Sequence, residues 1–308
     1  MAFSATDAAF EGFRIVRRNP IAVVAWSLVY LVVSLANVFA APAGARAMAE
    51  LTELTEAMEE SPPTTLEGFM PILSAYGDLM SQMAWIVPLS MITGAILAAA
   101  VARAVLTPDA NKRFGYVRLG MDEVRVFVVT LAIVIMVCLA TVAAFALASV
   151  MGGLAIAAMQ GWGVLVMVLL FLAATALLIW LVVRWSLAVP ITVAEKRFAI
   201  FDSFGLTKGR FWPLLGMAII AGVMVIIIGL LSMIATLPLT MITGANMMSA
   251  GGDPAAMLES YNPTNPWILV SAVVNSIING LIVGVLYAPF SVAYLAYSDK
   301  SAPDRQQA

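Results

Sequence analysis

The residues best suited to chemistry are acids and bases that recur together beside long apolar runs. They fall in three segments, 8–18, 114–125 and 199–210. The first and third share the pattern Ala-x-Phe-acid-small-Phe followed by bases, and the second is a looser version of it. Neighbouring carboxylates and bases serve general acid–base catalysis, whereas Phe with Arg or Lys is typical of helices that lie at a membrane surface. The segments therefore admit a catalytic and a membrane-surface interpretation.

The catalytic interpretation lacks its usual participants, because the chain has no His, the commonest general base and metal ligand. A Ser-His-Asp triad and a His-based metal site are thereby excluded, and the single Cys, Cys138, lies in an apolar run where a buried small hydrophobe is expected. The acids of the three segments all have bases nearby, and surface ion pairs explain them more simply than proton transfer. These acids are Glu11, Asp122, Glu123, Glu195 and Asp202. We predict a non-enzymatic protein without catalytic residues, metal or cofactor.

The composition indicates a membrane protein. Of the 308 residues 62% are hydrophobic and 11% are charged, and the mean hydropathy is +0.99, whereas about a quarter of the residues of a soluble domain are charged. Six runs are long and apolar enough to span a bilayer, and none alternates in polarity as the strands of a β-barrel do. They cover about 21–41, 83–106, 126–150, 162–189, 214–237 and 267–297. We predict an all-α polytopic fold, a single membrane domain over 1–308 whose six transmembrane helices form three hairpins.

Two features near the N-terminus have more than one interpretation. The first apolar run follows two arginines, as the core of a signal peptide does, but it is longer than the roughly 7–15 residues of such a core, and we expect a retained span. The loop after it, 43–82, is acidic and carries two helical patterns: Ala45–Glu60, and a second one whose Thr64 and Glu67 have capping-box spacing. We interpret these acids as a solvated helix face, and a metal site is the alternative.

Basic residues near the span ends set the predicted orientation. They lie almost wholly in the N-terminal segment, in the loops after the second and fourth spans and in the C-terminal tail, whereas the other three loops contain only Arg46. Because Lys and Arg are retained on the cytoplasmic side, we place these segments and both termini in the cytoplasm of a bacterial inner membrane, and the 43–82 insertion in the periplasm.

The same basic segments are predicted to form three interfacial amphipathic helices, each preceding an odd-numbered span. Each segment has apolar residues at helical spacing, so that Phe side chains can enter the acyl boundary while Arg and Lys meet lipid phosphates. Each also has a signal for a helix start. The signals are Ser4 with Asp7, Pro108 with Asp109, and Thr192 with Glu195.

Two arginines lie near the cytoplasmic ends of the even-numbered spans. Arg103 is five residues before Pro108, and Arg184 is six before Pro190. Long basic side chains at span ends usually extend to the lipid phosphates, and the alternative is that both face an inner cavity that holds an anionic headgroup. The spans contain no Asp or Glu, which disfavours an ion-coupled transporter.

The sixth span is the most polar. Asn275 and Asn279 share one face with Ser271, and a neighbouring face carries the row Ser276, Gly280 and Gly284. Small and amide side chains in a span serve close helix packing and interhelical hydrogen bonds. Three interpretations remain open: packing within one chain, a subunit interface, or the polar lining of a ligand site or pore.

One motif resembles a known group of proteins. Arg184 begins Arg-x-Ser-Leu-Ala-x-Pro, Glu195 follows, and Ser203 begins Ser-Phe-x-Leu-Thr-Lys-Gly-Arg-Phe-Trp. This pattern, with Tyr116–Arg125, is similar to a broad bacterial group that includes the membrane domain attached to some glycerophosphoryl diester phosphodiesterases and several uncharacterised inner-membrane families. The resemblance is sharpest over about 103–213 and implies a polytopic inner-membrane protein. In that group the hydrolase activity belongs to a separate soluble domain, which we do not expect here, so the activity is not carried over.

The leading hypothesis is an integral inner-membrane protein that binds anionic phospholipid, a protein partner or both through its basic segments. The expected lipid-binding residues are Arg17, Arg18, Arg103, Lys112, Arg113, Arg118, Arg184, Lys196, Arg197, Lys208 and Arg210. The alternative is a passive transporter or channel for a small or lipid-like anion. A third class, a membrane-embedded enzyme acting on lipids, needs Glu123, Glu195 and Asp202 to converge on one pocket. A homo-oligomer or a partner membrane protein is the expected protein contact, and no nucleic acid is expected.

Overall fold

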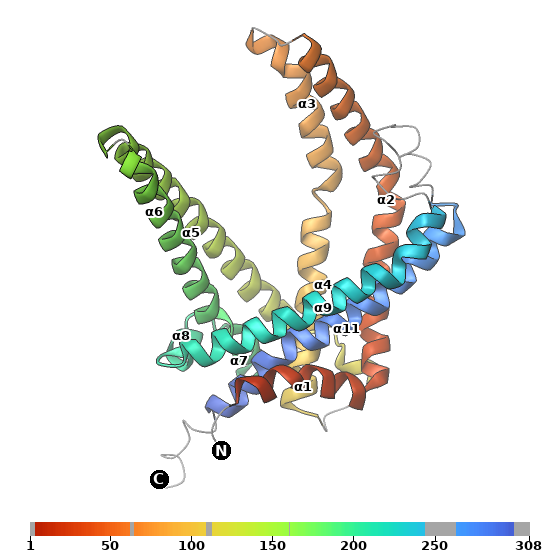
Figure 1. The fold of residues 1–308 in the computed structure, drawn as a ribbon. Helices are drawn as coiled ribbons and strands as arrows, with labels where there is room; N and C mark the ends of the chain where they lie inside the picture. Colours follow the sequence, from red (N-terminus) through yellow and green to blue (C-terminus); the bar gives the residue numbers. More distant parts are fainter. Residues whose placement is uncertain (1–3, 62–64, 109–112, 160, 244–262, 299–308) are drawn as a thin grey trace. The chain divides into compact units, whose positions relative to one another are not determined.

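The described parts of the chain fold into helices. The computed structural model describes residues 4–61, 65–108, 113–159, 161–243 and 263–298, and these contain no strand (Figure 1). Within these described residues, six segments are long and apolar enough to cross a membrane, which confirms the predicted all-α polytopic fold. Those segments are Pro20–Glu59, Glu67–Leu106, Phe114–Met159, Gly161–Glu195, Phe211–Ile242 and Pro266–Ser298.

Two compact units share the chain, and three of the long helices contribute to both. Unit 1 holds residues 1–19, 95–224 and 283–308, and unit 2 holds 20–94 and 225–282. The helices are α1 (Ala5–Arg18), α2 (Pro20–Glu60), α3 (Leu66–Met83), α4 (Ile86–Leu106), α5 (Met121–Met159), α6 (Gly161–Trp185), α7 (Ala188–Glu195), α8 (Asp202–Thr207), α9 (Phe211–Thr243) and α11 (Pro266–Ser298). All the basic segments singled out in the sequence belong to unit 1.

In unit 1, α5 and α6 form a long hairpin (green in Figure 1). Glycines let the two helices approach closely where they meet near the turn. A Cβ atom on Gly163 would collide with the backbone of Ala155 and Ile156, and one on Gly152 would lie 2.5 Å from the side chain of Met167. Without a hydrophobic driving force between helices in lipid, such close backbone packing is a main source of association.

Cys138 on α5, expected to be buried, is exposed because this part of the hairpin presents apolar side chains outward.

Adding one methyl group at Gly163 is therefore expected to weaken the packing of α5 against α6. Replacing Gly163 by Ala should lower the free energy of unfolding by about 1–3 kcal/mol, because the new Cβ has no space beside Ile156. Thermal unfolding in detergent measures the change. Gly161→Ala is the matched control, since a Cβ there meets nothing within 4 Å. Equal unfolding temperatures for the two variants would contradict the close approach.

The core of unit 1 is built on the alanine-rich end of α4. Ala95, Ala98, Ala99 and Ala102 pack with Val126 of α5 and Val193 of α7. Small side chains on α4 allow both neighbours to pack against it. The end of α4 that holds Arg103 is thereby fixed against the beginning of α5.

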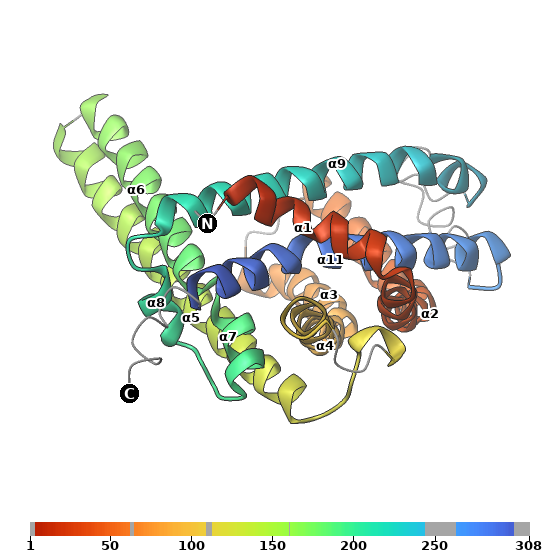
Figure 2. The same ribbon diagram turned by 90° about the horizontal axis from the view of Figure 1, so that it is seen from below.

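Helix α1 is strongly amphipathic and packs on α11 (Figure 2). Its buried face consists of Ala8, Ala9, Gly12 and Ile15, and a Cβ on Gly12 would lie 2.6 Å from the Cα of Val285. As predicted, the Ser4 hydroxyl caps the helix by accepting a hydrogen bond from the backbone N–H of Asp7 at 3.2 Å. The first of the three predicted helices that precede a span is therefore present.

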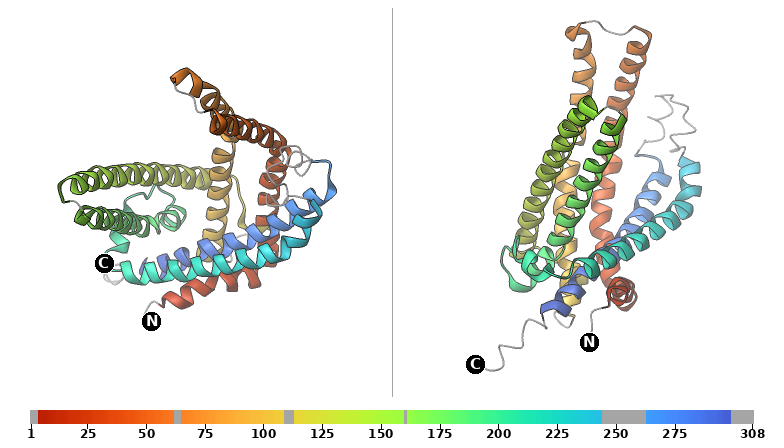
Figure 3. Two further views of the ribbon diagram at one scale, coloured as in Figure 1. Left: turned by 45° about the horizontal axis from the view of Figure 1, so that its top comes forward. Right: turned by 60° about the vertical axis from the view of Figure 1, so that its left-hand side comes forward.

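In unit 2, α2 and α3 form a helical extension (Figure 3). The predicted helix Ala45–Glu60 is not separate, because α2 continues from the first span for 41 residues in all. At 1.5 Å per residue its length is about 60 Å, roughly twice the hydrocarbon thickness of a bilayer. Its glutamates therefore lie on the half that extends beyond the span. Thr65 is the N-cap residue of α3, and Thr64, the predicted one, lies outside the described residues.

Candidate functional site

Arg103 is buried in an ion pair at the junction of α4 and α5. It is 8% exposed, it pairs with Glu123, which is 6% exposed, and it donates a hydrogen bond to the carbonyl of Tyr116 at 2.8 Å. Glu123 also accepts the backbone N–H of Gly120 at 2.9 Å and so caps the start of α5. Arg103 therefore neither extends to the membrane surface nor faces an open cavity, but holds the turn between the two spans.

That turn replaces the second predicted interfacial helix. Residues Arg113–Tyr116 form a short 3-10 turn in which Phe114, Gly115 and Tyr116 have positive φ, and α5 begins only at Met121. The Tyr116 hydroxyl donates to the carbonyl of Pro108 at 2.8 Å, and this bond keeps the turn tight. The helix signal predicted at Pro108 and Asp109 falls partly outside the described residues, since Asp109 is not among them.

Arg184 lies at a break between α6 and α7. Its guanidinium donates to the Phe204 carbonyl at 3.0 Å and to the Thr207 hydroxyl at 3.1 Å, and it lies over the rings of Trp180 and Phe204. The hydrogen-bonding partners come from α8, the short helix that comes after α7. Arg184 is half-buried. Like that of Arg103, its guanidinium forms hydrogen bonds within the protein and has a structural role.

Ser203 closes the same break from the other side. It is fully buried, and its hydroxyl donates to the Arg184 carbonyl at 2.6 Å and accepts the backbone N–H of Leu187 at 3.2 Å. These two backbone groups lie where α6 stops and α7 has not yet begun, so they have no helical partner. The motif that begins at Arg184 and resumes at Ser203 therefore encodes one structural unit.

The third predicted interfacial helix is shorter than expected. Helix α8 has six residues, and Thr192 and Glu195, predicted to begin this helix, belong instead to α7. Thr192 is buried and bonds back to the Ala188 carbonyl at 2.8 Å. Lys196 adopts the left-handed conformation, φ 51°, and ends α7.

The carboxylates of this region form ion pairs with arginines. Arg197 binds Glu195 and Asp202, and these hydrogen bonds raise the pKa of its guanidinium above the usual value. Glu123 is held separately by Arg103. The carboxylates that an enzyme would need to bring together are thus divided between two different arginines.

In the part of unit 1 formed by α1, residues 113–120 and the segment from α7 to the start of α9, several cations have no acidic partner among the residues that the structure describes. We call this region the basic end. The cations in question are Arg17, Arg118, Lys196 and Lys208, all exposed. By contrast, Arg14, Arg18, Arg125 and Arg197 are paired with acids, and Arg210 lies 4.3 Å from the ring centre of Tyr297. Lys112 and the side chain of Arg113 lie outside the described residues.

A large apolar side chain is exposed within four residues, along the chain, of each of these four cations. The neighbours are Phe13 at 40% exposure for Arg17, Leu119 at 83% for Arg118, Phe198 at 56% for Lys196 and Trp212 at 76% for Lys208. Exposed apolar groups next to unpaired cations are typical of surfaces that contact lipid headgroups and the acyl boundary.

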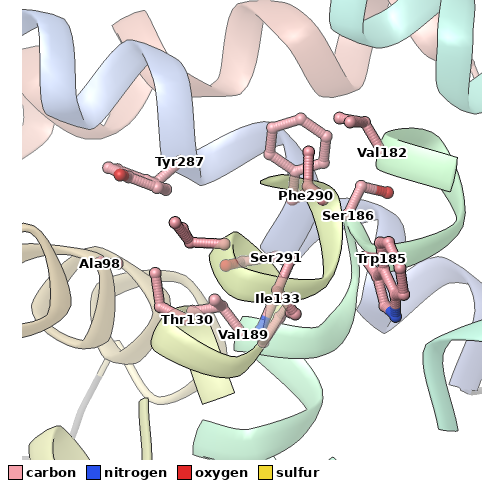
Figure 4. Close-up of a pocket in the computed structure, with 13 residues that line it drawn as sticks. Ala98, Thr130, Ile133, Val182, Trp185, Ser186, Val189, Tyr287, Phe290 and Ser291 are labelled. Atoms are coloured by element: carbon pink, nitrogen blue, oxygen red, sulfur yellow. The ribbon is translucent and has the colours of Figure 1, made fainter. Parts of the chain in front are cut away.

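Above the basic end, unit 1 contains an apolar cavity of about 240 Å³. Figure 4 shows Tyr287 and Phe290 of α11, Trp185 and Val182 of α6, and Ile133 of α5 around it. The remaining wall includes residues of α4 and α7, and the lining residues that carry polar side-chain groups are Thr130, Trp185, Ser186, Tyr287 and Ser291. Sequence reasoning missed this cavity, because it depends on where α6 breaks.

The polar residues of the sixth span serve packing in part. In unit 2, the Ser276 hydroxyl lies 3.2 Å from that of Ser34 on α2, and a Cβ on Gly280 would collide with Ser27. In unit 1, Gly284 lies against Gly12 of α1. In these contacts Ser276 and Gly280 lie against α2, and Gly284 lies against α1.

Among the residues that the structure describes, the two amides of that span bond only within α11. Asn275 and Asn279 donate to the carbonyls four residues before them on α11. Asn275 instead lines a shallow groove of about 300 Å³ in unit 2 with Ser34, Asn37 and Ser271. The sequence pattern identified the polar face, but only the structure shows that part of it is open.

The fold and the basic end together define an all-α polytopic membrane protein. The chain belongs to the family described as a domain of unknown function, DUF7847, whose model matches residues 5–297. No curated protein and no solved structure matches it significantly.

Proposed function

We propose that this protein is non-enzymatic and binds anionic phospholipid at the basic end, on the cytoplasmic side of a bacterial inner membrane. One observation carries the proposal: the exposed cations that lack an acidic partner among the described residues each have an exposed large apolar neighbour within four residues. Lipid phosphate supplies the missing counter-charge, and the acyl boundary takes up the apolar neighbour. The bias of Lys and Arg toward this end supports its cytoplasmic placement.

The proposal narrows the set of expected lipid-binding residues. Arg18 and Arg197 already form ion pairs with acidic side chains, and Arg103 and Arg184 form their ion pair and hydrogen bonds inside the fold. Their charges are therefore less available to a headgroup. The remaining described candidates are Arg17, Arg118, Lys196 and Lys208, with Arg210 as a partly engaged neighbour.

Neutralising two of these cations tests the proposal. Each basic residue near an anionic surface contributes about 1 kcal/mol, so Lys196→Gln with Lys208→Gln should lower the preference for anionic lipid roughly thirty-fold. Native mass spectrometry of protein taken from bilayers of phosphatidylglycerol and phosphatidylethanolamine measures the ratio retained. Arg46→Gln, an exposed arginine on α2, is the control and should change nothing. An unchanged ratio in the double variant would refute the proposal.

A second candidate, passive passage of a small or lipid-like anion, is supported by the polar groove of unit 2. Its amides, Asn37 and Asn275, each donate one N–H within their own helix, and their oxygens have no hydrogen-bond partner among the described residues. Such groups are costly against hydrocarbon and favour contact with a permeant, with a second copy or with a partner membrane protein.

Replacing both amides by Leu separates these possibilities. If the groove conducts, anion flux into liposomes should fall while the subunit count from single-molecule photobleaching stays the same. If the groove binds a second copy, the count should fall to one. A variant that changes neither the flux nor the count would remove both roles.

A further inference from the structure

We propose that the apolar cavity of unit 1 holds one acyl chain of the phospholipid bound at the basic end. The inference rests on the proposed function and adds a second contact to it: the cations select the headgroup, and the cavity holds the hydrocarbon. Its walls are almost wholly apolar, which suits a hydrocarbon chain and excludes a charged headgroup.

The end of the cavity nearer to the basic end lies at a depth that an acyl chain reaches. Along α5 the lining residues run from Thr130 to Val137, about nine to sixteen residues after the helix begins at Met121. At 1.5 Å per residue these positions lie about 14 to 24 Å from the basic end. Half of a hydrocarbon core is about 15 Å thick. An acyl chain whose phosphate lies at the basic end therefore reaches the near end of the cavity, at Thr130.

The cavity exists because α6 stops early. The chain leaves helical geometry after Trp185 and restarts at Ala188, and the bonds from Ser203 hold the break. Space remains between the end of α6 and α11, where Ala98 on α4 contributes only a methyl group. An unfilled apolar space forfeits the contacts of its lining, so a chain that fills it gains them.

The cavity is reached from the lipid side. Val134 and Val182 line it and are 42% and 51% exposed, so they form an opening on the outer face of α5 and α6. Helix α7 then connects the cavity to the cations, because Pro190 lines the wall and Lys196 ends the same helix six residues later, about 9 Å along its axis. One lipid molecule can therefore contact both.

Filling the opening tests the inference. Val134→Phe with Val182→Phe places rings at the mouth without enlarging buried side chains, and Val142→Phe, 68% exposed on α5 and outside the lining, is the control. In native mass spectrometry we expect the filled variant to retain about ten-fold fewer phospholipids, whatever their headgroup, and the control to match the unmodified protein. Retention equal to that of the control would overturn the proposal.

The test keeps the two proposals apart. Failure of the headgroup proposal leaves the anionic-to-zwitterionic ratio unchanged when Lys196 and Lys208 become Gln, whereas failure of the cavity proposal leaves total retention unchanged in the filled variant. If the retained molecule is an isoprenoid or a detergent rather than a two-chain phospholipid, the acyl-chain assignment is overturned.

A second measurement needs no substitution. With phosphatidylglycerol that carries a diazirine in its acyl chain, photolysis of the unmodified protein should label Ile133 and Val137 several-fold more than Val142. Equal labelling of the lining and of Val142 would also overturn the proposal.

Discussion

Replacing Glu123 by Leu should lower the free energy of unfolding by about 3–5 kcal/mol. The substitution leaves Arg103, which is 8% exposed, as a buried charge without its carboxylate, and uncompensated buried charges have costs of this size. It also removes the acceptor for the Gly120 N–H at the start of α5. Chemical denaturation in detergent, followed by circular dichroism, measures the loss.

Two further variants decide whether the charge is responsible. Arg103→Met combined with Glu123→Leu should recover most of the stability, because replacing both members of a buried pair by apolar residues is often neutral or favourable. Asp122→Asn, which breaks the half-exposed pair with Arg125, should cost less than about 1 kcal/mol. If the double variant is no more stable than Glu123→Leu alone, the loss does not come from the unpaired arginine.

Replacing Ser203 by Ala should lower the free energy of unfolding by about 2–5 kcal/mol. One hydroxyl satisfies both the Arg184 carbonyl and the Leu187 N–H in a fully buried position. Each buried polar group left without a partner costs about 1–3 kcal/mol. Because these groups lie at the break between α6 and α7, amide hydrogen exchange should also rise over 186–190.

Ser186→Ala is the matched control for that break. Ser186 is also a serine at the end of α6, but its hydroxyl donates only to the Val183 carbonyl of its own helix, at 2.7 Å. Its loss should cost less than about 1 kcal/mol and leave exchange over 186–190 nearly unchanged. Equal effects of the two substitutions would show that Ser203 has no special role in holding the break.

The spans could be predicted from the sequence because composition and length decide them. A run such as 162–189 has no other stable environment than a bilayer, and its predicted extent lies within the segment Gly161–Glu195. The N-cap of α1 could also be predicted, because its two residues, Ser4 and Asp7, are only three positions apart in the sequence. Features that depend only on neighbours along one helix could therefore be predicted from the sequence.

The arginine sites could not be predicted in the same way, because their partners come from other elements. Arg103 meets Glu123 twenty residues later, and Arg184 meets Thr207 across two turns and a short helix. Spacing alone indicates a cation near a span end, and snorkelling is the usual outcome there. The pairing of acids with particular bases, which leaves Lys196 and Lys208 without an acidic partner among the described residues, could also be seen only in the fold.

The residues that carry the resemblance now have a physical explanation. Arg184, Ser203 and Thr207 are bonded together around one helix break, so the motif describes a way of joining two spans. Kinship with the membrane domains of glycerophosphoryl diester phosphodiesterases stays a prediction.

The depth of Phe201 in a bilayer tests the central claim most directly, namely that the aromatic and cationic segments of the basic end contact lipid. Phe201 is 66% exposed, and Cys138 is the single Cys, so a spin label can be placed at 201 in a Cys138→Ala background. In phosphatidylglycerol-containing nanodiscs, electron paramagnetic resonance should find this label more accessible to oxygen than to a water-soluble nickel chelate, and a label at Glu56 the reverse. A label at 201 as accessible to the nickel chelate as the one at 56 would contradict the account.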